Sequence, residues 1–280
     1  MNNNSFLPLV SVVVITYNSS ETVIETLESI KSQTYQNIEL IVSDDCSTDD
    51  TVKVCQEWIN VNADHFVKTE LVTAEKNTGV SGNLNRGIRK SHGEWIKSIA
   101  GDDLLIPTAI EEYVKFVDEN RECQICVSKL LLFGTSEEKM TKTEKFLEAM
   151  YSSLSIANRK LQYRTALKKH ILPGPGIFYR KKLWELISGF DESYPFTEEW
   201  PFEIKVLSLT SIFLLKKKLV KWRQRPDSLC HLGISATKYQ NSEFYWDVRR
   251  NLLKKEFGFW TAFIFDLHQQ YRDKRFYRNR

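Results

Sequence analysis

Three clusters of polar side chains in the first half of the chain each follow a run of apolar residues. They are Thr16-Tyr17-Asn18, Asp44-Asp45 and Asp102-Asp103. Paired carboxylates suit a divalent cation that also binds phosphate oxygens, because magnesium-like ions use only one or two carboxylates and leave the other positions to phosphate and water. We expect Asp102-Asp103 to be such a cation site, and Asp44-Asp45 to accept hydrogen bonds from a ribose or a base. For each pair taken alone, a turn-forming role is an equally good interpretation.

The residues around these clusters alternate between strand and helix patterns. A continuous β-branched run predicts a buried strand at 10–15, and further strands are predicted at 38–43, 66–73 and 93–100. Apolar residues at helical spacing predict helices at 23–30, 51–59, 80–91 and 109–117. Strand–helix–strand repetition with short connections predicts an α/β fold with a doubly wound, mostly parallel sheet. Such sheets bind ligands at the carboxyl ends of their strands, which is where all three clusters stand.

The second half of the chain is less regular. We predict a helical stretch over 137–167, a turn at 173–176, a strand at 177–180, helices at 181–187 and 200–209, and a strand at 211–221. Cys126 is expected to point into the core from a further strand. One catalytic domain is predicted over 1–230, in two halves at about 8–125 and about 126–230, to which the resemblance described below assigns nucleotide and acceptor binding. Residues 231–280 are expected to form a helical C-terminal extension.

The composition argues against several classes of protein. Of the 280 residues, 42% are hydrophobic and 27% charged, and 39 Lys and Arg oppose 36 Asp and Glu, which is an ordinary globular balance and too mild to indicate a nucleic-acid partner. The five cysteines are scattered, so we expect no disulfide framework and a reducing, cytoplasmic compartment. We expect neither a signal peptide nor a membrane span, because no apolar run approaches the roughly 20 residues that cross a bilayer. The glycine-rich loops of nicotinamide enzymes and P-loop nucleotidases are also missing.

Four blocks of sequence, in order, carry a resemblance to a known family. They are VSVVVITYNSSETVIETLESIKSQTYQNIELIVSDDCSTDDT (10–51), EKNTGVSGNLNRGIRKSHGEWIKSIAGDDLLIP (75–107), GFDESYPFTEEWPFEIKVL (189–207) and WRQRPDSL (222–229). In these blocks the chain resembles the family 2 glycosyltransferases, which are inverting enzymes of the GT-A fold that use nucleotide-sugar donors. Bacterial members that build capsule, lipopolysaccharide or exopolysaccharide are the most similar in appearance.

The resemblance implies a role for each matching residue. Glu199, in TEEW, takes the position of the catalytic base, and Asp102 and Asp103 resemble the aspartates that hold the diphosphate through Mn²⁺ or Mg²⁺. Arg223 and Arg225 fall in the block that contacts the diphosphate. Tyr17 resembles the residue that stacks near the base, and Asp45 the one that bonds the base and ribose. The implied nucleotide-binding residues are Thr16, Tyr17, Asn18, Asp44, Asp45, Asn85 and Asp102.

Three positions depart from the family pattern. Ala100 stands where the family often has the first Asp of Asp-x-Asp-Asp, which removes one contact to the donor sugar or the metal. Glu199 replaces the usual Asp and is one methylene longer, which still permits base chemistry. The usual Arg-Asn reads Leu84-Asn85, and Arg86, displaced by one position, is expected to face another direction.

The resemblance implies an inverting transferase that moves a hexosyl or N-acetylhexosaminyl group from a nucleotide-sugar, with UDP the commonest donor nucleotide. A hydroxyl of a growing surface polysaccharide or lipid-linked glycan would attack the anomeric carbon while a carboxylate takes its proton. Two alternatives stay open. One is a degenerate sugar-nucleotide-binding scaffold, which Ala100 and Glu199 would explain. The other is a sugar nucleotidyltransferase, although its glycine-rich, basic N-terminal signature is missing.

The last segment combines aromatic and basic residues. From Arg249 to Arg280 there are nine Lys and Arg against three Asp and Glu. A basic amphipathic helix can lie in a membrane interface, which would place the protein on the inner face of the cytoplasmic membrane, near lipid-linked acceptors. An equally good interpretation packs the aromatic residues on the catalytic domain or at a homodimer interface.

Overall fold

The computed structural model of the chain describes residues 7–134, 137–194, 198–225 and 254. The chain divides into two compact units, Met1–Ala166 with His170–Pro226, and Leu167–Lys169 with Asp227–Arg280. All elements given below belong to the first unit. Apart from Lys254, the predicted extension over 231–280 lies outside the described residues, and so do its expected membrane and dimer contacts.

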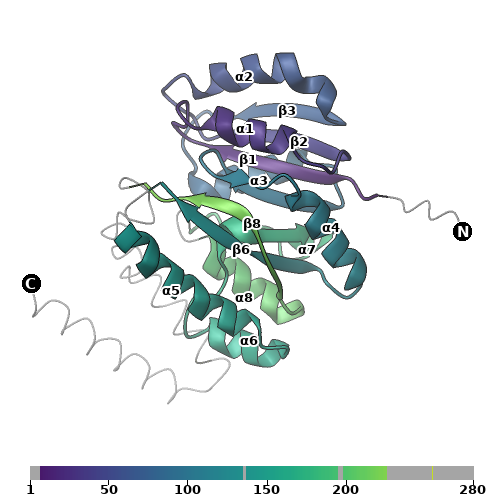
Figure 1. The fold of residues 1–280 in the computed structure, drawn as a ribbon, viewed down its shortest axis with the longest axis vertical. Coiled ribbons are helices and arrows are strands. Elements are labelled where there is room, and N and C mark those ends of the chain that lie inside the picture. Colours follow the sequence, from purple (N-terminus) through teal and green to yellow (C-terminus); the bar gives the residue numbers. More distant parts are fainter. Residues whose placement is uncertain (1–6, 135–136, 195–197, 226–253, 255–280) are drawn as a thin grey trace, which may run out of the picture. The chain divides into compact units, whose positions relative to one another are not determined.

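An eight-stranded sheet forms the centre of the first unit (Figure 1), in the order β3-β2-β1-β4-β7-β6-β8-β5. The strands are β1 (Val10–Thr16), β2 (Ile38–Asp44), β3 (Lys68–Thr73), β4 (Trp95–Ala100), β5 (Leu104–Leu105), β6 (Ile125–Phe133), β7 (Ile177–Arg180) and β8 (Phe213–Arg223). The pairs β1–β2, β1–β4, β2–β3 and β6–β8 are parallel. The short strands β5 and β7 make the antiparallel pairs. The predicted mostly parallel α/β sheet is therefore confirmed.

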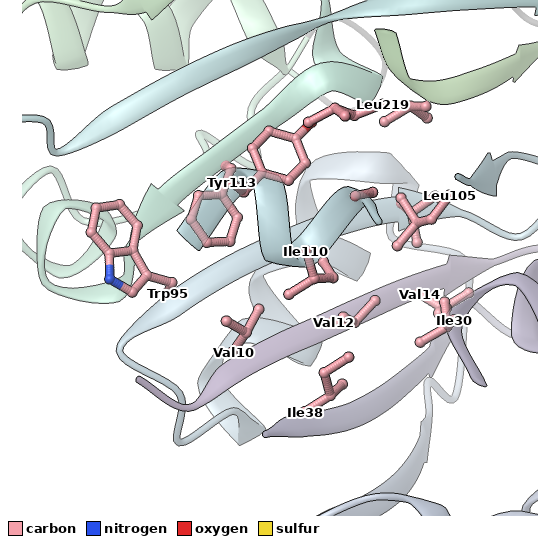
Figure 2. Close-up of a cluster of buried hydrophobic side chains, with 14 of the residues drawn as sticks. Val10, Val12, Val14, Ile30, Ile38, Trp95, Leu105, Ile110, Tyr113 and Leu219 are labelled. Carbon is pink, nitrogen blue, oxygen red and sulfur yellow. The ribbon is translucent and has the colours of Figure 1, made fainter. Parts of the chain in front are cut away.

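Helices pack on both faces of this sheet. They are α1 (Val23–Lys31), α2 (Thr51–Asn62), α3 (Gly79–Lys90), α4 (Ala109–Glu119), α5 (Glu137–Leu154), α6 (Arg159–Ala166), α7 (Lys181–Leu186) and α8 (Glu199–Leu209). Apolar residues of α1, α2 and α4 share one core with Val10, Val12 and Val14. Figure 2 shows these three valines along β1, with Ile110 of α4 beside them. Burial of such side chains, at roughly 25 cal/mol per Å² of apolar surface, is the main stabilising contribution to this fold.

The opposite face of β1 receives α3, and a glycine makes this approach possible. A Cβ on Gly87 would lie 2.5 Å from Cγ1 of Val13 and 3.2 Å from Cβ of Ser43. Any side chain at this position would therefore push α3 away from β1 and β2. The close contact fixes the C-terminal half of α3 on β1 and β2.

Two predictions change in the second half of the chain. The helical pattern over 137–167 forms two helices, because Asn158 interrupts it and accepts the N–H of Leu161 on its side-chain oxygen at 3.1 Å. The strand expected around Cys126 is β6, which runs on to Phe133. Its length was not predicted, because Lys129 interrupts the apolar run that would have indicated it.

The register of β7 decides what lies beyond the end of β4. Trp95 pairs with Arg180 and Lys97 with Phe178 in antiparallel register, so the residues that precede Ile177 run alongside the last residues of β4 toward its carboxyl end. Because β6 is antiparallel to β7 and parallel to β8, the ends of β6 and β8 point the same way as the end of β4. We call this side the carboxyl end of the sheet, defined by Thr16, Asp44, Ala100, Phe133 and Arg223.

Candidate active site

The loops after β1 and β2 are joined by side chains that were predicted to bind nucleotide. Asp44 is 1% exposed. Its Oδ1 accepts the N–H of Ser47 at 2.8 Å, and its Oδ2 accepts the hydroxyls of Thr16 (2.8 Å) and Ser47 (2.5 Å). Asn18, at φ +50°, donates its N–H to Ser47 Oγ and accepts the N–H of Thr48, both at 2.9 Å. These contacts build the loops, and the nucleotide-binding roles of Thr16, Asn18 and Asp44 stay predictions.

Asp49 strengthens the same pair of loops, and the sequence analysis did not single it out. Its carboxylate accepts the N–H groups of Ser20 (3.1 Å) and Thr51 (3.0 Å), and also the Thr51 hydroxyl. Although partial burial opposes ionisation, these hydrogen bonds lower the pKa of Asp49 to about 2. The carboxylate is therefore charged at every physiological pH. The available sequence signal was its place two residues before α2, where Asp commonly accepts helix N–H groups.

Tyr17 lies between these loops and is 50% exposed. Large aromatic residues of globular proteins are mostly buried, so a tyrosine half open to solvent at the carboxyl end of a strand is the kind of surface on which a base stacks. Its neighbour Thr16 is 2% exposed. The stacking role of Tyr17 stays a prediction, and the position of the side chain agrees with it.

Asp45 is directed at the start of α3. It is 2% exposed and accepts the N–H groups of Thr78 (2.9 Å) and Gly79 (2.8 Å) as well as the Thr78 hydroxyl (2.6 Å). Its Oδ1 also lies 3.0 Å from Nη2 of Arg86. Both the helix dipole and the guanidinium therefore compensate the buried charge. Arg86, which was expected to face elsewhere, points back into this site and also donates to Asn83 Oδ1 at 3.0 Å.

Asn85 connects α3 to the GFDE segment at 189–192. Its Nδ2 donates to the carbonyl of Phe190 (2.9 Å) and to Glu192 (2.8 Å), and its Oδ1 accepts the N–H of Phe190 (3.0 Å). The hydrogen bond from Asn85 is the main reason that the pKa of Glu192 is lowered. Two of the sequence blocks that carry the resemblance are thus held together by one buried amide. Its predicted contact with nucleotide is not tested by this arrangement.

Asp102 and Asp103 point in different directions. Asp103 is 2% exposed and its Oδ1 accepts the backbone N–H of Arg223 at 2.8 Å. Burial, together with the charge of Asp102, raises the pKa of Asp103 well above its usual range. Asp102 is partly exposed, and its carbonyl accepts Nε of Arg223 at 2.7 Å. Asp103 thus holds β8 in place, while Asp102 is the carboxylate of the pair that is open to solvent.

This donor set fits a cation held largely by its substrate. Among the described residues, no group of three or more His, Cys, Asp and Glu side chains could hold a metal ion. A magnesium-like ion needs only one or two carboxylates when phosphate oxygens and water complete its shell. Asp102 can supply one such ligand, and a bound diphosphate would have to supply others.

Helix α1 fixes the segment that carries Asp102 and Asp103. Thr22 donates its hydroxyl to the carbonyl of Gly101 and Thr26 donates to the carbonyl of Asp103, both at 2.8 Å. A Cβ on Gly101 would lie 2.9 Å from Cγ2 of Thr16. The end of β4 therefore packs directly on the end of β1, and the first and third polar clusters become neighbours.

The two predicted diphosphate ligands lie at the end of β8. The guanidinium of Arg223 stacks on the ring of Phe133, 4.6 Å from its centroid, and Nη2 lies 2.8 Å from Glu25 in α1. Arg225 is partly buried two residues further on. Arg223 therefore stands beside Asp102 with its orientation fixed by three neighbours. Contact of either arginine with a diphosphate stays a prediction.

Glu199 begins α8 next to the turn that precedes β7. The turn consists of Pro173–Gly176, and a Cβ on Gly174 would lie 2.3 Å from Oε1 of Glu199. By the register of β4 and β7, this turn lies at the carboxyl end of β4, so Glu199 reaches the same end of the sheet as Asp102. Burial and the charge of Glu199 raise the pKa of Glu198 well above its usual range.

A second carboxylate of α8, that of Glu203, contacts His170, and neither residue was predicted from the sequence. Nδ1 of His170 lies 2.9 Å from Oε2 of Glu203, which is fully buried and also accepts the N–H of Ile171 at 3.1 Å. Burial opposes protonation of the imidazole, but Glu203 and then Glu199 raise the pKa of His170. Glu203 follows Glu199 by four residues, one helical turn, and that spacing was the signal in the sequence.

In the described part of the chain, no helix is both long enough and apolar enough to cross a membrane. The finding does not bear on the expected contact of residues 231–280 with a membrane surface.

Comparisons with known proteins point to one family. A model of the family described as Glycosyl transferase family 2 matches residues 11–187. EpsE of Bacillus subtilis is 34% identical over 126 residues, which are 45% of this chain and 44% of EpsE. Glycosyltransferase GlyA of Streptococcus pneumoniae is 27% identical over 224 residues, which are 79% of this chain and 31% of GlyA. The chain thus spans less than half the length of each of these relatives.

Solved structures share the fold. TarS 1–349 of S. aureus in complex with UDP-GlcNAc superposes with a TM-score of 0.61 at 19% identity, over 90% of this chain and 72% of TarS 1–349. The mannosyltransferase PcManGT of Pyrobaculum calidifontis, in complex with GDP-Man and Mn²⁺, gives a TM-score of 0.61 at 18% identity, over 84% of this chain and 62% of PcManGT. The sheet of this chain is therefore of the type found in these GT-A glycosyltransferases.

Proposed function

Because the chain belongs to glycosyl transferase family 2, we propose that it transfers a sugar from a UDP-sugar to an acceptor hydroxyl with inversion at the anomeric carbon. The observation that carries the proposal is that Asp102 and Glu199 reach the same end of the sheet from opposite halves of the chain. One carboxylate is suited to a diphosphate with its cation, and the other to an acceptor. The solved relative TarS binds UDP-GlcNAc, which favours UDP as the nucleotide to test first.

In the proposed reaction, Glu199 accepts the proton of the attacking hydroxyl. The acceptor oxygen forms a bond to the anomeric carbon, and the bond from that carbon to the diphosphate oxygen breaks, so UDP leaves with the electron pair. Because acceptor and leaving group lie on opposite faces of the sugar, the configuration inverts. Glu199 is partly buried at the start of α8, so its carboxylate is held by the helix and is still within reach of solvent and of an acceptor.

The nucleotide is proposed to lie across the loops after β1 and β2. Tyr17 offers its exposed ring to the base, and Asp45 lies in the adjoining loop. Thr16, Asn18, Asp44 and Asn85 shape this surface through the hydrogen bonds described above. For Asp45, direct contact with base or ribose would have to occur beside the hydrogen bonds that it already accepts from the start of α3.

The diphosphate is proposed to lie between Asp102 and the end of β8. Asp102 would hold a divalent cation, Mn²⁺ or Mg²⁺, which would neutralise charge that develops on the leaving diphosphate. Arg223 and Arg225 stand at the same end of the sheet and offer guanidinium donors suited to phosphate oxygens. Asp103 orients this group by holding the backbone of Arg223.

The acceptor is proposed to be a growing surface polysaccharide or a lipid-linked glycan, on the cytoplasmic side of the membrane. This part of the proposal rests on the resemblance and on the basic, aromatic sequence of 249–280, which lies outside the described residues apart from Lys254. Whether the sugar is a hexose or an N-acetylhexosamine is decided by comparing UDP release from UDP-hexoses and UDP-N-acetylhexosamines.

The test is thermal stabilisation of the chain by UDP, GDP, CMP and dTDP, each with and without Mn²⁺. A ligand at 100 times its dissociation constant adds about 2.7 kcal/mol to the free energy of unfolding. We expect a metal-dependent rise in melting temperature with UDP, followed by UDP release from a UDP-sugar. Binding without any turnover would favour the scaffold alternative, which the replacement of the usual Asp by Ala100 suggests. No stabilisation by any nucleotide would contradict the proposal.

A further inference from the structure

The turn at Pro173–Gly176, which we call the PGPG turn, is held by two buried side chains that have no part in the proposed reaction. It forms one turn of 3-10 helix, Gly174–Gly176, in which Gly176 donates its N–H to the carbonyl of Pro173 at 3.1 Å. Its two prolines restrict φ and remove two N–H donors. The backbone is therefore stiff, and two of its carbonyl groups point into the core.

Lys97 is the first of these side chains. It comes from the centre of β4 and is fully buried, and its Nζ donates to the carbonyls of Pro175 and Ser98 at 2.7 Å each. A lysine is almost never fully buried without partners, because removing its charge from water is costly. A methionine of similar length would fill the same core space at no such cost. The cost therefore indicates that the contact with Pro175 serves a purpose other than packing.

Tyr113 is the second side chain. It comes from α4, is fully buried, and its hydroxyl lies 2.9 Å from the carbonyl of Gly176 and 2.6 Å from Oγ of Ser128 in β6. On the same side, a Cβ on Gly176 would lie 2.5 Å from the carbonyl oxygen of Ser128. The PGPG turn is thus fixed to β4, α4 and β6 at once.

The other side of the PGPG turn receives Glu199. Gly174 has no side chain, and the Glu199 carboxylate occupies the space that a Cβ would need, with Oε1 2.3 Å and Cγ 3.0 Å from that position. The helix that carries Glu199 is itself fixed, because Trp200 donates to the carbonyl of Ala166 at 2.9 Å and Phe202 stacks on Phe190 at 4.4 Å. The place of the carboxylate is therefore set by the helix on one side and by the PGPG turn on the other.

We propose that the PGPG turn fixes the position of the Glu199 carboxylate, and that Lys97 and Tyr113 act as positioning residues by holding the turn. The inference rests on the proposed function only in taking Glu199 as the base. A displacement of about 1 Å at a reacting group can cost on the order of 10²-fold in rate. A stiff turn beneath the base is a direct way to prevent such a displacement.

The first test does not depend on activity. Hydrogen exchange of the Gly174, Gly176 and Ile177 amides is measured in the wild-type chain and in Lys97→Met, which keeps the length of the side chain and removes the donor. We expect these amides to exchange about tenfold faster in the variant, because the hydrogen bond from the buried Lys97 amine to the Pro175 carbonyl is lost. Unchanged exchange at all three amides would overturn the inference.

The matched control for this measurement is Lys181→Met. Lys181 also donates its Nζ to a backbone carbonyl, that of Ser91, but at the opposite end of the sheet. This variant should leave exchange in the PGPG turn unchanged. Faster exchange in both variants would indicate general loosening of the chain, and would count against a specific role of Lys97.

The second test asks whether Gly174 and Glu199 are matched in size. UDP release from UDP-GlcNAc, with water or an added acceptor as nucleophile, is measured for Gly174→Ala, Glu199→Asp and the double variant. Gly174→Ala adds a methyl where the carboxylate lies, so we expect kcat to fall about 10²-fold with little change in KM for the donor. Since Asp is one methylene shorter, the same Gly174→Ala change should cost less than about threefold when combined with Glu199→Asp.

Equal effects of Gly174→Ala in the two backgrounds would overturn the size match. Tyr113→Phe, which removes only the hydroxyl, should lower kcat by a smaller factor and leave the KM for the donor unchanged. A wild-type chain that releases no UDP, or a fully active Glu199→Gln variant, would instead contradict the proposed function. The exchange measurement would still decide whether Lys97 holds the PGPG turn.

Discussion

Strand β2 carries a buried carboxylate near each of its ends, and the two are used differently. Glu39 lies at the amino end of the sheet, where its carboxylate accepts hydrogen bonds from the hydroxyl of Ser11 (2.6 Å) and the N–H of His92 (2.7 Å). Nδ1 of His92 also lies 2.7 Å from this carboxylate. Asp44 lies at the carboxyl end and accepts three hydrogen bonds within its own loops. Both side chains are 1% exposed. Burial and hydrogen bonding alone therefore do not separate a structural carboxylate from one near the site.

The residues around Glu39 and Asp44 distinguish the two carboxylates. At the amino end the chain closes over Glu39, since a Cβ on Gly93 would lie 2.5 Å from the backbone nitrogen of Ser11. The carboxyl end, where Asp44 lies, also carries Tyr17, Asp102 and Glu199, and these three side chains stay partly open to solvent. Among the described residues, the exposed side chain in contact with Glu39 at the amino end is that of His92 alone, whereas several polar clusters gather at the carboxyl end, which is where parallel sheets bind ligands. The predictions below test this difference between the two ends of the sheet.

The largest effect is expected at the carboxyl end, on turnover. Glu199→Gln removes the proposed proton acceptor and should lower kcat by about 10²–10⁴-fold, while UDP binding measured by calorimetry stays within about twofold. Glu39→Gln is the control, because it removes a buried charge at the amino end. Equal loss of kcat in both variants would contradict the distinction between the two ends.

Asp45 is expected to affect stability and binding together. Asp45→Ala leaves the start of α3 without its cap and Arg86 without its partner, which should cost about 3 kcal/mol in the free energy of unfolding. We also expect weaker UDP binding, because the loop after β2 loses its attachment to α3. Urea unfolding and calorimetry on the same samples measure both quantities. Loss of stability with unchanged UDP affinity would assign Asp45 to the scaffold alone.

Glu39 is expected to affect stability alone, and in a pH-dependent way. Burial opposes ionisation, but hydrogen bonds from Ser11 and His92 lower the pKa of Glu39 below 4.5. A carboxylate with a lowered folded-state pKa stabilises the chain at pH values above the unfolded pKa, and this stabilisation is lost as the pH falls through the folded pKa. Glu39→Gln should therefore be about 2 kcal/mol less stable at pH 7.

As the pH falls through the lowered folded-state pKa of Glu39, the stabilities of Glu39→Gln and the wild type should converge. Denaturant unfolding across this range checks the sign. A difference that grows on acidification would show that ionised Glu39 is not the stabilising form. UDP affinity at pH 7 should be the same in both chains.

The smallest effect is expected at Tyr17. Because its ring is half exposed, Tyr17→Ala should change the free energy of unfolding by less than about 0.5 kcal/mol. Loss of base stacking should weaken UDP binding by about 1–2 kcal/mol, or roughly tenfold. A matched exposed residue is Val61, 83% exposed on α2, and Val61→Ala should leave UDP affinity unchanged. Equal UDP affinity in Tyr17→Ala and the wild type would exclude the stacking role.

Local sequence patterns predicted the part of the fold that depends on neighbouring residues. The buried strands β1, β2 and β4 and the helices between them follow from runs and periods of apolar residues, and the polar clusters at 16–18, 44–45 and 102–103 follow directly after those strands. Parallel pairing then brings their ends together without further information. The length of β6 and the break between α5 and α6 were not predicted, because a lysine and an asparagine interrupt otherwise clear patterns.

The direction of each polar side chain was decided by contacts that are remote in the sequence. Asn85 holds Phe190, which lies 105 residues away, and Asp103 holds Arg223, 120 residues away. From the sequence, Arg86 was expected to face away from the site, and yet it pairs with Asp45. The sequence predicts only that Lys97 belongs to a strand. The antiparallel register of β7 brings the Pro175 carbonyl to the Lys97 amine. The sequence by itself determined which residue types reach the carboxyl end of the sheet, because strand and helix periods are local. Only the tertiary structure decided which of them are held in the scaffold and which stay open, because that depends on packing between distant segments.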